Sequence, residues 1–322
     1  MRVNDLWKSA QLRRFAVVVF YVAVAILCGL AIKASLGPAG VSSIIPAFLR
    51  LSPGAIALSA VTVICAFAAL VTIERLSMAD VIDGPTPPVI LAPFVASTLS
   101  LGAGFGPISG SALRIRIYAP FGIGPTGAVY LATTATFALL SGGIVITAVG
   151  SAFGALRLDG SLGPVEDLAQ IIGAAFGVAI VALIAVAGRH GRSFTVFKRT
   201  LRAPSAGALL LRIGAGTFNW ASTAVGIYVL LPDAGRPPVV DFIVTVSALK
   251  VASLMTGAPG GLGVFEALML SLTKGTLAPA DLTAALIVSR ILSFVAPVVL
   301  AGLGAALLEA QGRRFKSADE LR

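Results

Sequence analysis

The chain has 322 residues, of which 57% are hydrophobic and only 12% are charged, and its mean hydropathy is +0.98. A soluble domain carries about 25% charged residues, so this composition excludes an ordinary soluble enzyme. The net charge is +10, but Lys and Arg cluster in loops and tails, which indicates cationic loops at a membrane surface rather than nucleic-acid binding. We therefore expect an all-α polytopic membrane protein with a single membrane domain over residues 1–322.

Apolar segments long enough to cross a bilayer recur along the whole chain. A helix needs about 20 apolar residues to span the hydrocarbon core. Six segments have this length as simple spans: residues 15–32, 54–73, 125–149, 168–188, 213–231 and 291–308. We interpret residues 1–35 as containing the first span rather than a cleaved signal peptide, because the apolar run is long and no clean cleavage site follows it.

Basic segments set the expected orientation of these spans. The N-terminus, residues 189–203 and the C-terminus are rich in Lys and Arg, which places all three on the cytoplasmic side. The stretch 89–121 must then start and end inside, and the stretch 239–273 must start and end outside. Each contains a glycine-rich break, at residues 102–107 and 257–263. We predict two re-entrant helical hairpins beside the six spans, about eight hydrophobic segments in all, around a central polar cavity.

The two halves of the chain repeat one order of elements. Residues 15–149 and 168–308 each read as span, span, hairpin and span, with opposite starting sides. Inverted repeats with paired broken helices are typical of secondary transporters, which bind substrate near the midplane of the membrane. The alternative is eight ordinary spans, two of which are kinked at glycine.

Five ionisable side chains in or beside the hairpins and the last span are candidates for function: Arg114, Arg116, Lys250, Glu266 and Arg290. A charge in the middle of a span costs about 2.5–3.5 kcal/mol and usually serves a function. Lys250 and Glu266 lie on opposite arms of the second hairpin, so we expect them to pair, with Arg290 joining them or remaining apart. The excess positive charge suits an anionic ligand such as a lipid phosphate. The alternatives are an ion pair that only fixes the hairpin, and snorkelling of Arg114 and Arg116 to the interface.

Small residues at the two breaks are further candidates for contact with a substrate. Ser109 and Ser111 follow the first break, and Gly260, Gly261 and Gly263 form the second. The glycines allow close approach of the backbone. The helix that begins near Gly263 would direct unpaired N–H groups at the break, which favours an anion there.

Two other polar pairs interrupt or end the apolar segments. Asn219 and Trp220 lie in the middle of a span, where an interhelical hydrogen bond is the expected use, and contact between Asn219 and substrate is the alternative. Glu74 and Arg75 end the second span, and we expect them only to mark the membrane interface.

The sequence predicts no metal site, no cofactor and no catalytic residues. Cys28 and Cys65 lie inside apolar spans and are interpreted as small hydrophobic residues. The single histidine, His190, lies in a basic loop beside Arg189 and Arg192 and cannot build a metal cluster alone.

The motif Pro259-Gly-Gly-Leu-Gly-Val-Phe-Glu266, together with Gly110-Ser-Ala-Leu-Arg114-Ile-Arg116-Ile-Tyr118, resembles the membrane domain of the lysylphosphatidylglycerol synthase/flippase family. The resemblance covers essentially the whole chain and implies a lipid flippase module. In bifunctional members this module moves aminoacylated phosphatidylglycerol to the outer leaflet, which gives resistance to cationic peptides. Only 14 residues follow Leu308. We therefore expect the cytoplasmic synthase domain, and lipid aminoacylation, to be absent, unless the chain is part of a larger enzyme.

These inferences predict a lipid flippase of the bacterial inner membrane with both termini in the cytoplasm. It would move an anionic or aminoacylated phospholipid through a cavity between the hairpins, with the candidate Arg and Lys residues on the headgroup and Glu266 balancing charge. Two alternatives stay open: a non-transporting membrane partner of a separate lipid synthase, and an intramembrane lipid-modifying enzyme. Membrane phospholipid is the expected partner, a homo-oligomer is an open alternative, and nucleic acid is not expected.

Overall fold

The computed structural model describes residues 41–82, 90–103, 106–155, 193–196, 199–202, 204–255, 261, 263–272 and 277–319, with isolated positions between 171 and 182. The predicted first span, Cys28, His190 and Gly260 lie outside the described residues. Of the predicted span 168–188, only the isolated positions are described.

The described residues are helical apart from one short β-hairpin. The helical elements are η2 (Val41–Ser43), α2 (Ile44–Leu49), α3 (Pro53–Met78), α4 (Leu91–Ala103), α5 (Gly106–Tyr118), η3 (Ala119–Phe121), α6 (Pro125–Ala152), α8 (Ala206–Tyr228), α9 (Val239–Met255), α10 (Val264–Leu272), α11 (Pro279–Arg290), the π-helical η6 (Ile291–Val295) and α12 (Ala296–Asp319). Strands β1 (Ser193–Val196) and β2 (Arg199–Arg202) pair antiparallel within the basic segment 189–203. The all-α prediction missed this hairpin, because a polar loop carries no apolar period to indicate strands.

Local sequence signals set where the long helices begin. Ser52 and Ser205 precede α3 and α8, and each hydroxyl accepts a hydrogen bond of 3.1 Å from the backbone N–H three residues on. A serine in this position satisfies one of the unpaired N–H groups of the first turn. Proline occupies the first helical position of α3, α6 and α11, where its missing N–H costs nothing.

Among the described residues, three helices are long and apolar enough to cross a membrane: Pro53–Met78, Pro125–Ala152 and Pro279–Leu308. They contain the predicted spans 54–73, 125–149 and 291–308. The last one begins upstream of the apolar run 291–308, because α11, η6 and α12 form one continuous helix. The predicted span 213–231 corresponds to α8, which is less apolar because it carries Arg212, Asn219 and several glycines. Helix α8 packs against α3, α6 and α9, so much of its surface contacts protein and not lipid, and that part does not have to be strongly apolar.

Each predicted hairpin contains two helices, one on each side of its predicted break. Helices α4 and α5 have 13 residues each, and α9 and α10 have 17 and 9. All four are shorter than the roughly 20 residues of a full crossing. In both pairs the two helices contact each other. Re-entry into the membrane, the count of eight segments and the inverted repeat remain predictions.

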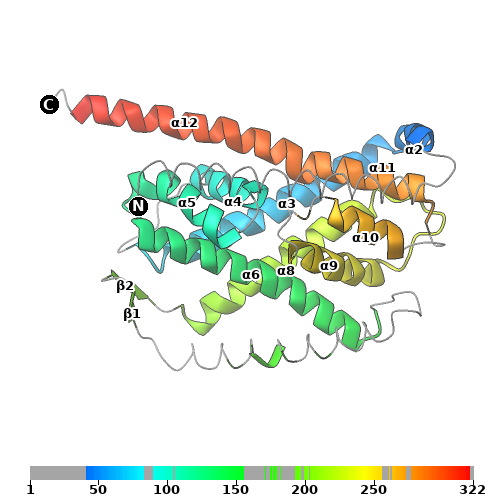
Figure 1. Cartoon of the computed structure of the whole chain (residues 1–322), viewed down its shortest axis with the longest axis horizontal. Helices are drawn as coiled ribbons and strands as arrows, with labels where there is room; N and C mark the ends of the chain where they lie inside the picture. The colour runs from blue at the N-terminus through cyan, green and yellow to red at the C-terminus, as the bar shows by residue number, and fades with distance from the viewer. Residues whose placement is uncertain are drawn as a thin grey trace, which may run out of the picture.

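The two helix pairs lie at opposite ends of the bundle. Figure 1 shows α4, α5, the β-hairpin and the C-terminal end of α12 toward one end of the long axis, with α2, α9 and α10 toward the other. Helices α3, α6 and α8 run between them and contact one another. Two of the segments predicted to be cytoplasmic, the β-hairpin and the C-terminal end of α12, therefore lie toward the same end (Figure 1).

The surface of this bundle is apolar, whereas its interior contains charges. Leucine and other large apolar side chains are exposed along α3, α6, α8 and α12; Leu303 on α12 is 62% exposed. Glu74, Arg114 and Arg212 are at most 2% exposed. A water-soluble fold has the opposite distribution, so this surface fits contact with lipid tails.

Glycine lets the central helices touch backbone to backbone. A Cβ on Gly142 of α6 would lie 2.3 Å from the backbone of Gly216 on α8, and a Cβ on Gly216 would lie 2.1 Å from the carbonyl oxygen of Ala138. No side chain fits between these helices at that point. Small residues at such crossings are typical of helix packing within membranes.

Candidate functional site

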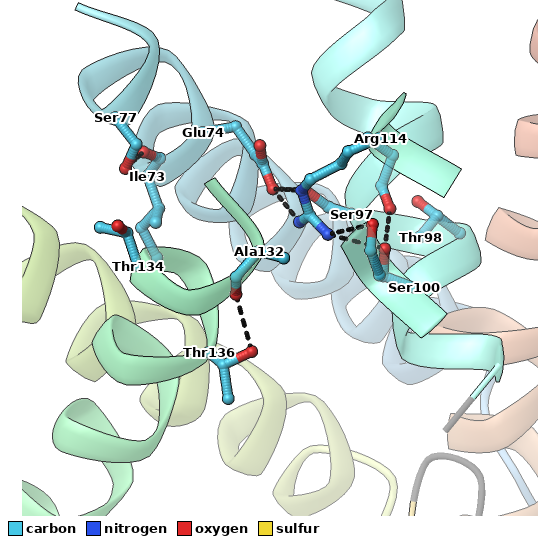
Figure 2. A network of polar contacts seen from close by, with 12 residues as sticks. Ile73, Glu74, Ser77, Ser97, Thr98, Ser100, Arg114, Ala132, Thr134 and Thr136 are labelled. Carbon is cyan, nitrogen blue, oxygen red and sulfur yellow. Dashed lines mark hydrogen bonds and ion pairs between the residues drawn. The ribbon is translucent and has the colours of Figure 1, made fainter. Parts of the chain in front are cut away.

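The first cluster of buried charges joins α3, α4 and α5 (Figure 2). Glu74 on α3 forms an ion pair with Arg114 on α5; Arg114 Nε donates to Oε1 at 3.0 Å, and Nη2 donates to the same oxygen. Ser97 of α4 donates to Oε1 at 3.3 Å, and the Tyr118 hydroxyl donates to Oε2 at 3.1 Å. Arg114 Nη1 donates to the Ser100 hydroxyl at 2.9 Å and to a backbone carbonyl at 3.1 Å.

This cluster is internally satisfied. Both carboxylate oxygens of Glu74 accept hydrogen bonds, and all three guanidinium nitrogens of Arg114 donate them. Gly110 makes room for the guanidinium, because a Cβ there would lie 2.8 Å from Arg114 Nη1. The geometry supports a role in fixing the first helix pair to α3, rather than one in holding a ligand.

The position of these residues corrects one prediction and decides between two others. Glu74 does not mark the interface, since its side chain has no exposed surface. Arg114 is buried and does not snorkel, whereas Arg116 is exposed. Ser111 is partly buried on α5, and the side chain of Ser109 lies outside the described residues.

The second cluster lies beside the break between α9 and α10. Glu266 in the first turn of α10 forms an ion pair with Arg290 at the end of α11. Its second oxygen accepts a hydrogen bond of 2.7 Å from the N–H of Gly263. The carboxylate therefore occupies one of the N–H groups that the sequence predicts to be open to an anion, as the acidic residue of a capping box does.

Lys250 on α9 joins this cluster without pairing with the carboxylate. The predicted Lys250–Glu266 ion pair is wrong within the described residues, because Glu266 pairs with Arg290 instead. The Lys250 Nζ lies 5.6 Å from the centre of the Trp220 ring, within the range of a cation–π contact.

A hollow opens where these residues meet. The hollow is small in this conformation, with room for about one water molecule. It is lined by Ile227, Lys250, Phe265, Leu286, Ser289, Arg290 and Ser293. Positive charge, two hydroxyl groups and apolar side chains thus face one opening, next to the start of the π-helix η6. A π-helical turn inside an α-helix is often found at a functional site.

The glycines of the second break hold a conformation that other residues rarely adopt. Gly261 and Gly263 have φ angles of +66° and +79°. A Cβ on Gly261 would also lie 2.4 Å from the Ser253 hydroxyl oxygen. Both glycines therefore serve the turn itself.

Asn219 and Trp220 make the interhelical hydrogen bonds that the sequence predicts. The Asn219 side-chain amide donates to the carbonyl oxygen of Ala66 on α3 at 2.8 Å. The Trp220 ring N–H donates to the carbonyl oxygen of Leu139 on α6 at 2.7 Å. Asn219 thus holds α8 against α3, away from the residues that line the hollow.

A third buried cluster was not predicted from the sequence. Arg212 Nη2 on α8 donates to Asp80 Oδ2 at 2.5 Å and to the carbonyl oxygen of Leu76 at 2.7 Å. The Tyr130 hydroxyl of α6 donates to the same Asp80 oxygen at 2.6 Å. Each charge lies within about two turns of the end of an apolar segment. A charged residue in such a position can have a buried partner, but it can equally lie at the membrane interface, so the sequence alone does not distinguish the two cases.

Two known proteins are similar in sequence to this chain. An uncharacterised protein of Synechocystis sp., slr0712, is 27% identical over 235 residues, which cover 70% of this chain and 72% of that protein. The inner membrane protein YbhN of Escherichia coli is 27% identical over 150 residues, which cover 45% of this chain and 46% of YbhN. The latter match therefore spans about half of YbhN. No family model matches the chain. The similarity to YbhN and the apolar helices together identify the chain as a helical membrane protein.

Proposed function

We propose that the protein is a transporter, not an enzyme, that moves an anionic or aminoacylated phospholipid between the leaflets of the membrane. The observation that carries this proposal is the hollow lined by Lys250 and Arg290 beside a break between two short helices. Buried cations in a membrane protein are costly and usually mark the path of a substrate or an ion.

The lining of the hollow suits the two parts of a lipid. Lys250, Arg290 and the serine hydroxyls offer positive charge and donors to a phosphate, while Phe265 and Leu286 offer an apolar wall to the first carbons of the tails. Arginine is well suited to phosphate because its planar group presents several N–H donors at once.

The arrangement of the helix pairs supports movement between leaflets. Two broken helix pairs at opposite ends of one bundle fit the predicted inverted repeat, in which two halves rock around one site. In this proposal the α4/α5 pair is closed, because the Glu74–Arg114 cluster holds it against α3. The α9/α10 pair is open, because the hollow lies beside it. In this proposal Arg114 supports the fold, and the headgroup binds beside Lys250.

A reconstituted system tests the proposal directly. The purified full chain is placed in phosphatidylcholine vesicles that contain tail-labelled phosphatidylglycerol or lysylphosphatidylglycerol, and exchange between leaflets is measured by chemical quenching of the outer label. We expect exchange of at least one of these lipids, and a fall of about tenfold for Lys250→Gln, because a charge-assisted hydrogen bond is lost.

A surface variant provides the matched control. Arg50→Gln also removes one cation, but the Arg50 side chain is 63% exposed and pairs with Asp281 at the surface. This variant should exchange lipid at the wild-type rate. No exchange of either lipid by the wild type, above protein-free vesicles, would refute the transport proposal.

A further inference from the structure

The charges around the hollow do not balance. Lys250 and Arg290 line it, and Glu266 forms an ion pair with Arg290. Two cations and one carboxylate give the site a net charge of +1 among the described residues. The break residues 256–260 and 262, which the structure does not describe, contain no ionisable side chain. Among the described residues that meet at the hollow, the charge without a counter-charge is therefore that of Lys250.

Two hydroxyl groups add hydrogen-bond donors on the same wall. Ser289 and Ser293 are four residues apart, so their side chains follow one another along the same face of the helix. Ser289 is only 5% exposed. An oxygen-rich anion in the hollow would accept hydrogen bonds from both hydroxyl groups.

We infer that this hollow selects a headgroup with one net negative charge, namely a phosphodiester, and rejects an aminoacylated headgroup of net positive charge. The inference rests on the proposed transport function and narrows its substrate class. A phosphodiester brings one negative charge and unesterified oxygens, so it neutralises Lys250 and accepts from the serine hydroxyls. A lysyl ester adds two ammonium charges to the same phosphate and would leave the buried site strongly positive, which a low-dielectric interior penalises.

The apolar part of the lining favours a lipid as the source of the phosphodiester. Ile227, Phe265 and Leu286 share the hollow with the polar groups. A soluble glycerophosphodiester would leave these side chains in contact with water, whereas a lipid would cover them with its glycerol and first tail carbons. We therefore expect the lipid to bind more tightly than its soluble headgroup.

Binding is measured apart from transport, with Trp220 as the reporter. The chain contains two tryptophans, so Trp7→Phe leaves Trp220, whose ring lies 5.6 Å from Lys250 Nζ, as the sole source of tryptophan fluorescence. The full chain in neutral detergent is titrated with phosphatidylglycerol, lysylphosphatidylglycerol, phosphatidylcholine or soluble glycerophosphoglycerol. Phosphatidylglycerol should bind with a Kd about tenfold or more below those of the other three, because only it neutralises the site and covers its apolar wall.

Charge variants in the same background give the sharper comparison. Lys250→Arg should keep the preference for phosphatidylglycerol, and Lys250→Gln should reduce it to within about twofold, since the net charge falls to zero. Lys250→Glu gives a net charge of −1 and should reverse the preference toward lysylphosphatidylglycerol. Arg50→Gln should bind like the parent, which separates the local effect from the total charge of the protein.

Three outcomes would overturn the inference. They are equal binding of phosphatidylglycerol and lysylphosphatidylglycerol by the parent, an unchanged preference in Lys250→Gln, and equally tight binding of the soluble diester. Selective binding without leaflet exchange would refute transport but leave the charge selectivity standing. Exchange of both lipids at one rate, with no selectivity in binding, would refute the charge selectivity but leave transport standing.

Discussion

Glu74 shows what a buried carboxylate does in this protein. It has no exposed surface, and Arg114, Ser97 and Tyr118 together supply hydrogen bonds to both of its oxygens. A buried ion pair adds little stability by itself, because removing two charges from solvent is expensive. Breaking it is a different matter, since one charge is then left buried alone.

This difference predicts the behaviour of Glu74→Gln. The substitution keeps the size of the side chain but leaves the Arg114 cation without its counter-charge, and we expect a loss of about 3–5 kcal/mol in the free energy of unfolding. The double variant Glu74→Leu/Arg114→Met should recover much of that loss, because no buried charge remains. Thermal unfolding in detergent measures both effects.

An exposed pair supplies the control for this experiment. Asp281→Asn breaks the Arg50–Asp281 pair, where Arg50 is 63% exposed, and it should change the free energy of unfolding by less than about 1 kcal/mol. If Glu74→Gln keeps full stability but abolishes lipid exchange, the carboxylate contacts substrate and our structural assignment is wrong.

The sequence reveals the charged residues of the site better than their partners. Arg114, Lys250 and Arg290 could be chosen because a cation in an apolar segment is unusual. Their partners depend on which helices come together, and that information lies in the tertiary packing. Glu74 is 40 residues from Arg114 and sits where an interface residue would also sit. The Arg212–Asp80 pair was not predicted for the same reason, since its members are 132 residues apart in the sequence.

At the scale of the helices, close contact between α6 and α8 is a feature that substitution can test. Gly216→Ala would place a Cβ 2.1 Å from the carbonyl oxygen of Ala138, so the two helices must separate. We expect a loss of about 1–3 kcal/mol in the free energy of unfolding, as for other overpacked interiors. Thermal unfolding in detergent again provides the measurement.

Gly214 on the same helix is the matched control. A Cβ at Gly214 meets no atom within 4 Å, so Gly214→Ala should leave stability unchanged or raise it by up to about 1 kcal/mol through its higher helix propensity. Equal effects of the two substitutions would show that helix propensity, and not the crossing, decides the result.

Sequence patterns predicted helices and breaks more readily than the details of their ends. Glycine clusters located both breaks, and Asn219 was assigned to an interhelical hydrogen bond, which the structure confirms. The π-helix Ile291–Val295 was not predicted, because no simple pattern of residue types distinguishes one π turn from an α-helix. The β-hairpin was missed for a similar reason, since only four residues form each strand.

At the scale of the whole molecule, two of the basic segments lie toward the same end of the bundle, and the side of the membrane that this end faces remains a prediction. Helices α4 and α5, the β-hairpin and the end of α12 all lie toward one end of the bundle (Figure 1). The sequence alone could assign these segments to one side through their positive charge. It could not establish the repeat, because the two halves share little beyond their glycine-rich breaks.

Labelling of single cysteines in intact cells tests this orientation. In a background without Cys28 and Cys65, new cysteines at Pro88 and Thr126 flank the first hairpin, and those at Pro238 and Ala280 flank the second. An impermeant thiol reagent should label the second pair from outside and the first pair only after the membrane is opened. If the two members of either pair are labelled from opposite sides, that hairpin is a full crossing and the predicted repeat fails.

The contact of α6 with α8 has a consequence for how the molecule could move. Gly142 and Gly216 leave no interlocking side chains where α6 crosses α8. The two helix pairs lie toward opposite ends of the bundle, with α6 and α8 between them (Figure 1). Sliding one helix past the other would drive a Cβ of a neighbouring residue into the facing backbone, whereas tilting about the crossing keeps the contact intact. We therefore expect α6 and α8 to tilt about this contact, so that one end of the protein closes as the other opens.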